Sequence, residues 1–304
     1  MSTTINFIGK ALLIVTLLFA LDQGLSRVFQ RYFFKAPYGD IRDINYIMSE
    51  SNEKLIAMGS SKARHHFVSS LLQDGLNISA FNAGMDGKGI FYHYVLLTSI
   101  LERYKPEIII LDLSVKDLTA STDFGFDALN QILPYYGKVH SLDTLIAIQG
   151  FSEVLKVQSG LFRYNSKLAQ LIGSYTIPYK IEKGYNPLRG KWKGGLAELE
   201  RTNYQHDSTK VTYIQKFIDL TRSRGVKLVV TISPVFRMQT SEQDVYAELT
   251  KMLESNGIPH LVLNQSPEFL EHPEWFADPA HLNDTGARVF TQKVIGLVNS
   301  VLRK

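Results

Sequence analysis

The chain has 304 residues, of which 45% are hydrophobic and 20% are charged, and it has no cysteine. This is the composition of an ordinary globular protein, so it excludes a disordered chain, a disulfide framework and a thiolate metal site. The 33 basic and 29 acidic residues give a formal net charge of +4. Because no dense cluster of lysine and arginine with interleaved aromatic residues stands out, the sequence argues against a nucleic acid partner.

An apolar run near the amino terminus, Ala11 to Leu21, is interrupted only by Thr16. Its length lies between the roughly 7 to 15 apolar residues of a secretory signal and the roughly 20 of a membrane-spanning helix. No cleavage site of small residues follows Ala20, so we expect residues 1–26 to be a membrane anchor or an uncleaved signal. A buried helix of a soluble domain fits less well, because the run begins so close to the terminus.

The basic residues around this segment bear on its orientation. Arg27, Arg31 and Lys35 follow the apolar run, whereas only Lys10 and the terminal amine precede it. The positive-inside rule therefore favours a cytoplasmic location for the rest of the chain. Residues 27–50 are expected to form a juxtamembrane segment, since aromatic and basic residues are mixed at its start in the pattern of a helix at a membrane surface.

The remainder of the chain alternates short apolar runs with amphipathic segments. Each run ends at turn residues, which is typical of buried strands, and the segments between have helical spacing. The alternation predicts a three-layer α/β/α sandwich with a doubly wound, mostly parallel five-stranded sheet. We expect strands at 55–58, 78–81, 108–111, 226–232 and 261–263, and helices at 68–75, 90–104, 208–224, 241–256 and 284–302. Between about 118 and 204 the alternation lapses, and helical spacing at 142–157 and 164–171 predicts a largely helical insertion.

Gly59-Ser60-Ser61 directly follows the first predicted strand. Ligands of open α/β sheets bind at the carboxyl ends of the strands, and the amides at the start of a following helix favour negative charge. A serine in this position is well placed to act as a nucleophile. The alternative is an ordinary turn in which a serine caps the helix.

Asp278 and His281 supply the partners that such a nucleophile needs. A serine hydroxyl becomes reactive when a base removes its proton, and a carboxylate holds that base in the correct orientation. Both residues lie in a loop before the last predicted helix. This loop is expected at the same edge of the sheet as Ser61. The pair also has a purely structural interpretation, next to the expected helix cap Asn283. In combination with the strand-terminal serine, the catalytic interpretation is favoured.

Four segments resemble, in order and spacing, the sequence blocks of SGNH (GDSL-type) hydrolases: Gly59 to Ser61, Asn82 to Gly87, 108–117, and Asp278 to Asn283. The likeness is greatest to membrane-anchored bacterial members with Gly-Ser-Ser in place of Gly-Asp-Ser, some of which act on O-acyl groups of cell-envelope polymers. The resemblance excludes the middle insertion. It implies a flavodoxin-like domain of the SGNH type for residues 51–304, placed in the periplasm or otherwise outside the cytoplasm.

This resemblance implies roles for three residues. Ser61 would be the nucleophile, His281 the general base and later the general acid, and Asp278 the carboxylate that orients the histidine. The family's oxyanion donors are the amide of the nucleophile, a loop glycine amide and an asparagine side chain. Gly87 matches the glycine by its distance from Asn82.

The asparagine donor has no counterpart in this chain. Where the family has Gly-x-Asn-Asp, the sequence reads Ser114-Val115-Lys116-Asp117. Lys116 is an alternative oxyanion donor, or it is solvated or paired with Asp117. Loss of one such donor typically lowers the rate roughly a hundred- to a thousandfold, so acyl transfer stays open beside hydrolysis.

Three further residues are candidates for substrate contact: Arg64, His65 and Asn82. The first two follow the nucleophile, where a packing role is the alternative, and Asn82 begins a glycine-rich loop. That loop has no GxGxxG spacing, so it does not predict a dinucleotide site. The histidines elsewhere lack the spacing of metal ligands, and we expect neither a metal nor a cofactor.

The leading hypothesis is a membrane-anchored serine esterase or acyltransferase for O-acetyl or similar esters of an envelope or exported polysaccharide. One alternative is a catalytically silent SGNH-like protein that binds or scaffolds polysaccharide-assembly proteins, which the lysine at position 116 and the insertion suggest. A second alternative is a lipid esterase, which the anchor and the aromatic residues after it suggest.

Overall fold

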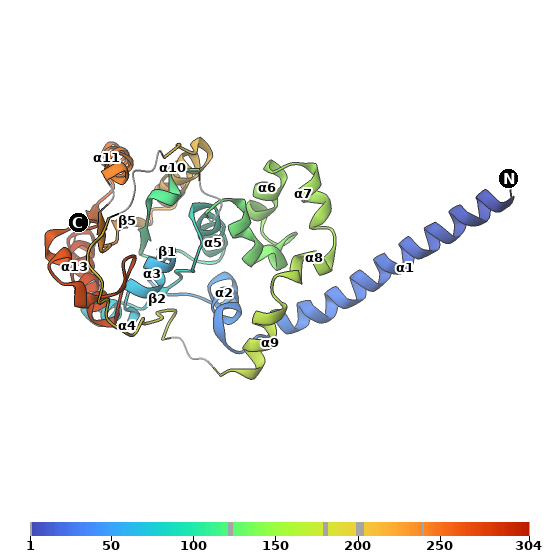
Figure 1. Ribbon diagram of the computed structural model, residues 1–304, viewed down its shortest axis with the longest axis horizontal. Coiled ribbons are helices and arrows are strands. Elements are labelled where there is room, and N and C mark those ends of the chain that lie inside the picture. The colour runs from blue at the N-terminus through green and yellow to red at the C-terminus, as the bar shows by residue number, and fades with distance from the viewer. Residues whose placement is uncertain (1, 121–123, 179–181, 199–203, 239, 304) are drawn as a thin grey trace. The chain divides into compact units, whose positions relative to one another are not determined.

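A computed structural model describes residues 2–120, 124–178, 182–198, 204–238 and 240–303 (Figure 1). The predicted insertion includes 121–123, 179–181 and 199–203, which lie outside the described residues. The chain forms two compact units. The helical unit comprises residues 1–45 and 129–180, and the sheet unit comprises residues 46–128 and 181–304. The end of the predicted juxtamembrane segment and both ends of the predicted insertion thus belong to the sheet unit.

The sheet unit contains the five-stranded parallel sheet that the sequence predicts. Its strands are hydrogen-bonded in the order β2-β1-β3-β5-β7, and every neighbouring pair is parallel. The strands are β1 Leu55–Gly59, β2 Ala80–Asn82, β3 Ile108–Asp112, β5 Lys227–Ile232 and β7 His260–Val262. Continuous apolar runs suit the central strands, because a parallel sheet is covered by helices on both faces. The predicted fold class is confirmed.

Two groups of helices cover this sheet. Helix α5 packs against α10, whereas α3 and α4 pack against α13. The helices of the sheet unit are α3 Ser61–His66, α4 Ser69–Leu76, α5 Ile90–Arg103, α10 Ser208–Ser223, α11 Thr240–Ser255, α12 Pro267–Leu270 and α13 Asp284–Leu302, with 3-10 turns η1 Val115–Asp117 and η3 Pro273–Trp275. Two short strand pairs complete the unit: parallel β4 Ala197–Glu198 with β6 Arg237–Met238, and antiparallel β8 Phe276–Asp278 with β9 His281–Leu282.

The core of the sheet unit follows the two-residue period of the strands. Leu55 and Ala57 on β1 and Ile108 and Ile110 on β3 belong to one cluster, which also contains Phe290 of α13. Each is fully buried. Burial of a leucine or phenylalanine side chain contributes about 1.5–3 kcal/mol, so this cluster fixes α13 and the hairpin before it against the sheet.

The helical unit begins with one unbroken helix, α1 Ser2–Phe33. The other helices within the unit are α6 His140–Ile148, α7 Phe151–Lys156, α8 Gly160–Asn165 and α9 Leu168–Thr176, while α2 Gly39–Ser49 and η2 Phe126–Tyr135 cross the boundary between the two units. Within the described residues, α1 is the one helix long and apolar enough to span a bilayer, by length and composition alone. Its apolar side chains are exposed along most of its length.

The last turns of α1 differ from the predicted surface-lying segment. Phe33 is fully buried and makes edge-to-face contacts with Tyr135 and Tyr164, at ring centroid distances of 6.3 and 5.8 Å. Its carbonyl accepts a hydrogen bond of 2.6 Å from Asn45. Phe33 therefore belongs to the core of the helical unit, whereas the neighbouring Tyr32 is 50% exposed.

Candidate active site

The nucleophile candidate stands on a tight turn between β1 and α3. Gly59 ends β1 with φ +144°, and a Cβ atom there would lie 2.7 Å from the carbonyl oxygen of Asp112 and 2.8 Å from the Cβ of Ala63. Only glycine satisfies both the backbone angle and the close approach. The turn brings Ser61 to the first position of α3, at the carboxyl end of the strand.

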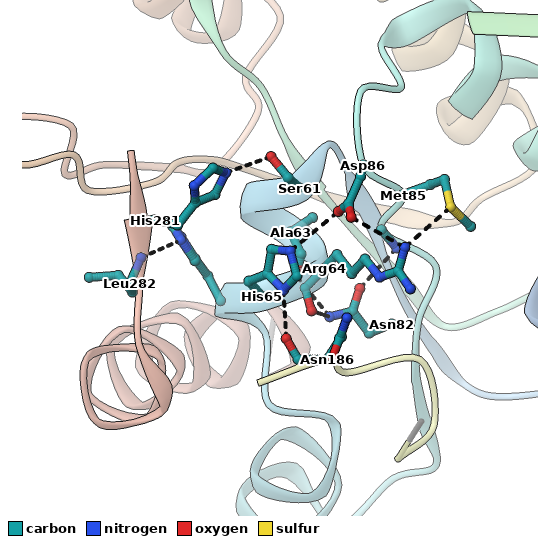
Figure 2. Close-up of polar contacts among 12 residues, drawn as sticks. Ser61, Ala63, Arg64, His65, Asn82, Met85, Asp86, Asn186, His281 and Leu282 are labelled. Atoms are coloured by element: carbon teal, nitrogen blue, oxygen red, sulfur yellow. Dashed lines mark hydrogen bonds and ion pairs between the residues drawn. The ribbon is translucent and has the colours of Figure 1, made fainter. Parts of the chain in front are cut away.

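The structure brings together the three residues that the sequence analysis paired. Ser61 Oγ lies 2.8 Å from His281 Nε2, and the two side chains point toward one another (Figure 2). His281 Nδ1 lies 3.0 Å from each carboxylate oxygen of Asp278. The histidine is thus in contact with a hydroxyl on one side and a carboxylate on the other. Such an arrangement permits proton transfer from the hydroxyl to a ring that the carboxylate orients.

Asp278 and His281 lie on a β-hairpin rather than in the expected open loop. They are register partners on β8 and β9. Asp278 Oδ1 also accepts hydrogen bonds from the amides of Ala280 at 2.7 Å and His281 at 3.0 Å, which fixes the carboxylate within its own turn. Partial burial opposes ionisation of Asp278, but the hydrogen bonds from His281 and Ala280 outweigh it, so the pKa of the carboxyl lies below its ordinary value.

His66 holds the hairpin through a hydrogen bond to its second strand, β9. Its Nε2 accepts a hydrogen bond of 2.9 Å from the amide of Leu282, the residue after His281. The ring is fully buried. Burial, and then the charge of His281, hold the pKa of His66 well below its ordinary value. The neutral ring therefore carries its proton on Nδ1 and serves as an acceptor that positions β9.

The chain was compared with protein families, with curated proteins and with solved structures, and only the solved structures include similar chains. No family model matches the sequence, and no curated protein matches it. The chain is similar to a candidate acylhydrolase from Bacteroides fragilis, with 11% identity and a TM-score of 0.42 over 86% of this chain and 94% of that one. It is also similar to a lipase/acylhydrolase from Enterococcus faecalis, with 13% identity and a TM-score of 0.39 over 81% and 95%. A third similar structure is a GDSL-like lipase from Bacteroides thetaiotaomicron, with 10% identity and a TM-score of 0.40 over 82% of this chain and 87% of that one.

The glycine-rich loop after β2 lies across the first turn of α3. The amide of Met85 donates to the carbonyl of Gly59 at 3.0 Å, and a Cβ on Gly84 would lie 2.4 Å from the amide nitrogen of Arg64. Gly87, the predicted oxyanion glycine, has φ +68° and is exposed. The loop thus runs past the nucleophile turn in direct contact with it, and a positive φ explains the glycine at position 87.

Asp117 joins the two loops that carry the oxyanion candidates. Its Oδ1 accepts from the amide of Ile90 at 3.0 Å, and its Oδ2 accepts from the amide of Ser114 at 2.9 Å. Burial raises the pKa of Asp117 to about 6. Lys116 is exposed, and its ammonium lies 5.6 Å from the ring centroid of Phe124. The sequence analysis missed this role of Asp117, although the Ser-x-x-Asp spacing of a capping box indicates it.

Of the three candidates for substrate contact, Arg64 and His65 lie beside the triad. Both contact the carboxylate of Asp86: Arg64 Nη1 forms an ion pair with it at 3.5 Å, and His65 Nε2 lies 3.3 Å from it (Figure 2). The His65 ring stands edge-to-face to the His281 ring, with centroids 5.8 Å apart. Partial burial opposes ionisation of Asp86, but the interactions with His65 and Arg64 outweigh it and lower the pKa of the carboxyl.

Asn82 has a different position from the other two. Its amide nitrogen donates to the carbonyls of Ala63 at 2.7 Å and Phe67 at 2.9 Å, and its Oδ1 accepts from the amide of Gly84 at 2.9 Å. The residue is 1% exposed. These contacts make Asn82 a clamp between the loop and the backbone of α3. The side chains of Arg64 and His65 are also largely buried, with exposures of 6% and 8%, so all three residues stay candidates for substrate contact.

Lys62, which follows the nucleophile, is a buried lysine that was not among the predicted site residues. Its ammonium has no hydrogen-bond partner within the described part of the chain. Burial, and then the charge of Arg237, lower the pKa of Lys62. Nearby, burial raises the pKa of Asp112 to about 6, and Asp112 accepts hydrogen bonds of 2.7 Å from the hydroxyls of Thr231 and Ser233. Among the residues that the structure describes, no group of side chains has the arrangement of a metal site.

Proposed function

We propose that this protein is a serine-dependent esterase or O-acyltransferase that works through an acyl-enzyme on Ser61. The observation that carries the proposal is the continuous contact from Ser61 Oγ through His281 to Asp278, with distances of 2.8 and 3.0 Å. Over these distances a base can take a hydroxyl proton, and a carboxylate can stabilise the imidazolium that results.

In the proposed reaction, Ser61 Oγ attacks the carbonyl carbon of an ester while its proton moves to His281 Nε2. The amides of Ser61 and Gly87 stabilise the oxyanion, with Lys116 as a further candidate donor. When the intermediate collapses, the bond to the alcohol oxygen breaks and this oxygen takes the proton from His281. Water or an acceptor hydroxyl then attacks the acyl carbon while His281 takes its proton. The bond between the acyl carbon and Ser61 Oγ breaks, and His281 gives the proton to Oγ.

As substrates we propose O-acetyl or similar O-acyl esters of a cell-envelope or exported polysaccharide. The support is the resemblance of the four sequence segments to SGNH hydrolases and the exposed apolar helix α1, which as a retained anchor would keep the enzyme at the envelope. We propose an extracytoplasmic catalytic unit, although Arg27, Arg31 and Lys35 after the apolar run favour the opposite orientation. Protease digestion of intact and lysed cells tests this part, since an extracytoplasmic unit is cut in intact cells when the outer barrier is permeabilised.

Two neighbouring serines provide a matched test of the chemistry. Ser60 is buried and, as the cap residue of α3, forms no capping hydrogen bond through its side chain. With the full-length protein in detergent, we expect Ser61→Ala to abolish hydrolysis of a small acetyl ester and labelling by a fluorophosphonate, and Ser60→Ala to retain both. Activity that persists in folded Ser61→Ala contradicts the proposal.

The same assay separates the alternative functions. A folded wild-type protein that is neither labelled nor active supports the silent scaffold, and a preference for long acyl chains supports the lipid esterase. Release of acetate and formation of an acetylated glycan, measured with an added glycan acceptor, distinguish hydrolysis from transfer.

A further inference from the structure

We infer that the helical unit contacts lipid through a second element besides α1. Three side chains define what we call the α7–α8 apolar surface, and each is at least 37% exposed: Phe151, Leu155 and Phe162. Phe151 is 76% exposed, which is unusual for a large aromatic side chain in a soluble protein. Exposed apolar patches of this kind mark contacts with proteins or membranes.

The position of this surface along α1 indicates a bilayer as its partner. The stretch of α1 from Thr4 to Leu21 has 18 residues, with Lys10 as its one charged residue. At about 1.5 Å per residue its length is close to the roughly 30 Å of a hydrocarbon core. Asp22 is the first acidic residue of the chain. If α1 crosses a bilayer, Asp22 therefore marks the depth at which the hydrocarbon ends.

Asp22 also attaches α8 to α1 at this depth. Its carboxylate accepts hydrogen bonds from Ser159 Oγ at 2.6 Å and from the amides of Gly160 at 2.8 Å and Leu161 at 3.0 Å. Gly160 approaches α1 so closely that a Cβ there would meet the side chain of Ser26 at 2.1 Å. The start of α8 is thereby fixed at the boundary between hydrocarbon and headgroups.

An apolar groove lies between α1, α8 and α9, close to Asp22 along α1. It has a volume of about 380 Å³ and is lined by residues of α1, α8 and α9: Leu25, Phe29, Leu161, Phe162, Tyr164, Asn165 and Leu168. Figure 1 shows α8 beside α1, and α7 immediately precedes α8 in the chain. Lys156 of α7 pairs with Glu153 of the same helix at 2.6 Å, so the apolar side chains rather than charge are the basis of the lipid contact.

The start of α8 thus lies at the lipid–water interface, with the α7–α8 apolar surface at the level of the upper acyl chains. This inference rests on the bilayer insertion of α1 and is independent of the chemistry at Ser61.

Because the chain has no cysteine, single cysteines with a nitroxide label can test it. We would introduce Phe151→Cys and Leu155→Cys in the full-length protein and reconstitute it into phosphatidylethanolamine–phosphatidylglycerol vesicles. Leu17→Cys in α1 is the lipid reference and Glu254→Cys, exposed on α11, the aqueous one. Lys156→Cys is the control on α7 itself. Accessibility to oxygen is compared with accessibility to a water-soluble nickel complex.

We expect the labels at 151 and 155 to have an oxygen-to-nickel ratio severalfold above that at 254, and the label at 156 to have a lower ratio than either. Ratios at 151 and 155 equal to that at 254 overturn the inference, because the surface then lies in water. Exclusion of both reagents also overturns it, since the surface is then covered by protein. An aqueous ratio at 17 shows instead that α1 does not insert, which overturns the premise without bearing on the esterase assay.

Discussion

Asp117 accepts a hydrogen bond from the amide of Ile90, and the 3.0 Å contact ties the turn after β3 to the start of α5. Because the same carboxylate binds the amide of Ser114, one side chain sets the separation of the loops that carry Gly87 and Lys116. The geometry of the proposed oxyanion site therefore depends on a residue that contacts no substrate.

Replacement of this carboxylate tests the dependence. In Asp117→Asn one carboxylate oxygen becomes an NH₂ group that faces a backbone amide, so at least one hydrogen bond is lost. We expect kcat to fall at least roughly tenfold, but by less than the hundred- to thousandfold that is typical when an oxyanion donor is lost. Fluorophosphonate should still label Ser61, at a lower rate. Kinetics with a small acetyl ester measure the change. An unchanged kcat in a folded variant contradicts the positioning role.

The triad itself makes a graded prediction. Loss of the base in His281→Ala should lower kcat/KM roughly 10⁴- to 10⁶-fold, and Asp278→Asn roughly 10⁴-fold, because the second change leaves the imidazole present but in the wrong tautomer. Glu274→Gln is a matched acidic control, since this exposed carboxylate pairs with His272. We expect its kcat/KM to equal that of the wild type. Equal losses in Asp278→Asn and Glu274→Gln would rule out the assigned role of Asp278.

Gly59 should tolerate an added methyl group poorly. The Cβ of Gly59→Ala would meet Asp112 and Ala63 below 3.0 Å at a φ of +144°, so we expect a loss of roughly 1–3 kcal/mol in the free energy of unfolding together with a misplaced nucleophile. Gly296→Ala, in α13 with open space around the added atom, should stabilise by up to about 1 kcal/mol. Chemical denaturation of both variants checks the contrast, and similar effects would contradict it.

The buried ring of His66 predicts how stability changes with pH. An unfolded histidine titrates near pH 6.5, whereas the pKa of His66 in the folded protein is well below this value. The unfolded state therefore binds a proton that the folded state does not, so the contribution of His66 is present above about pH 6.5 and is lost as the pH falls below it.

In His66→Gln, an amide oxygen replaces Nε2 as the acceptor for Leu282 and the titrating group is removed. We expect the free energy of unfolding of the wild type to fall more between about pH 7.5 and 5 than that of the variant. Urea denaturation at the two pH values measures both falls. Parallel losses in the two proteins would show that His66 does not titrate on unfolding.

Interruptions of regular structure and short elements such as the β8–β9 hairpin were not predicted from the sequence, whereas the five strands of the main sheet were. The segment 142–157 has continuous helical spacing, yet it breaks into α6 and α7 at Gly150, which has φ +116°. The spacing of apolar residues shows only which side of a helix is buried. It does not reveal a turn after which the apolar residues continue on the same side. Asn82 shows a related limit: a polar residue in a glycine-rich loop suggests a ligand, but burial made it a backbone clamp.

The sequence by itself determined the parallel sheet. The position of each strand follows from a local pattern, an apolar run that ends at turn residues. It also identified Ser61, Asp278 and His281 as a set, through residue chemistry and the shared edge of the strands. Only the tertiary structure decided that Ser61 and His281, 220 positions apart, lie 2.8 Å from one another, and that Asp22 holds α8 against α1. Such contacts depend on the packing of whole elements, which no local pattern of residues encodes.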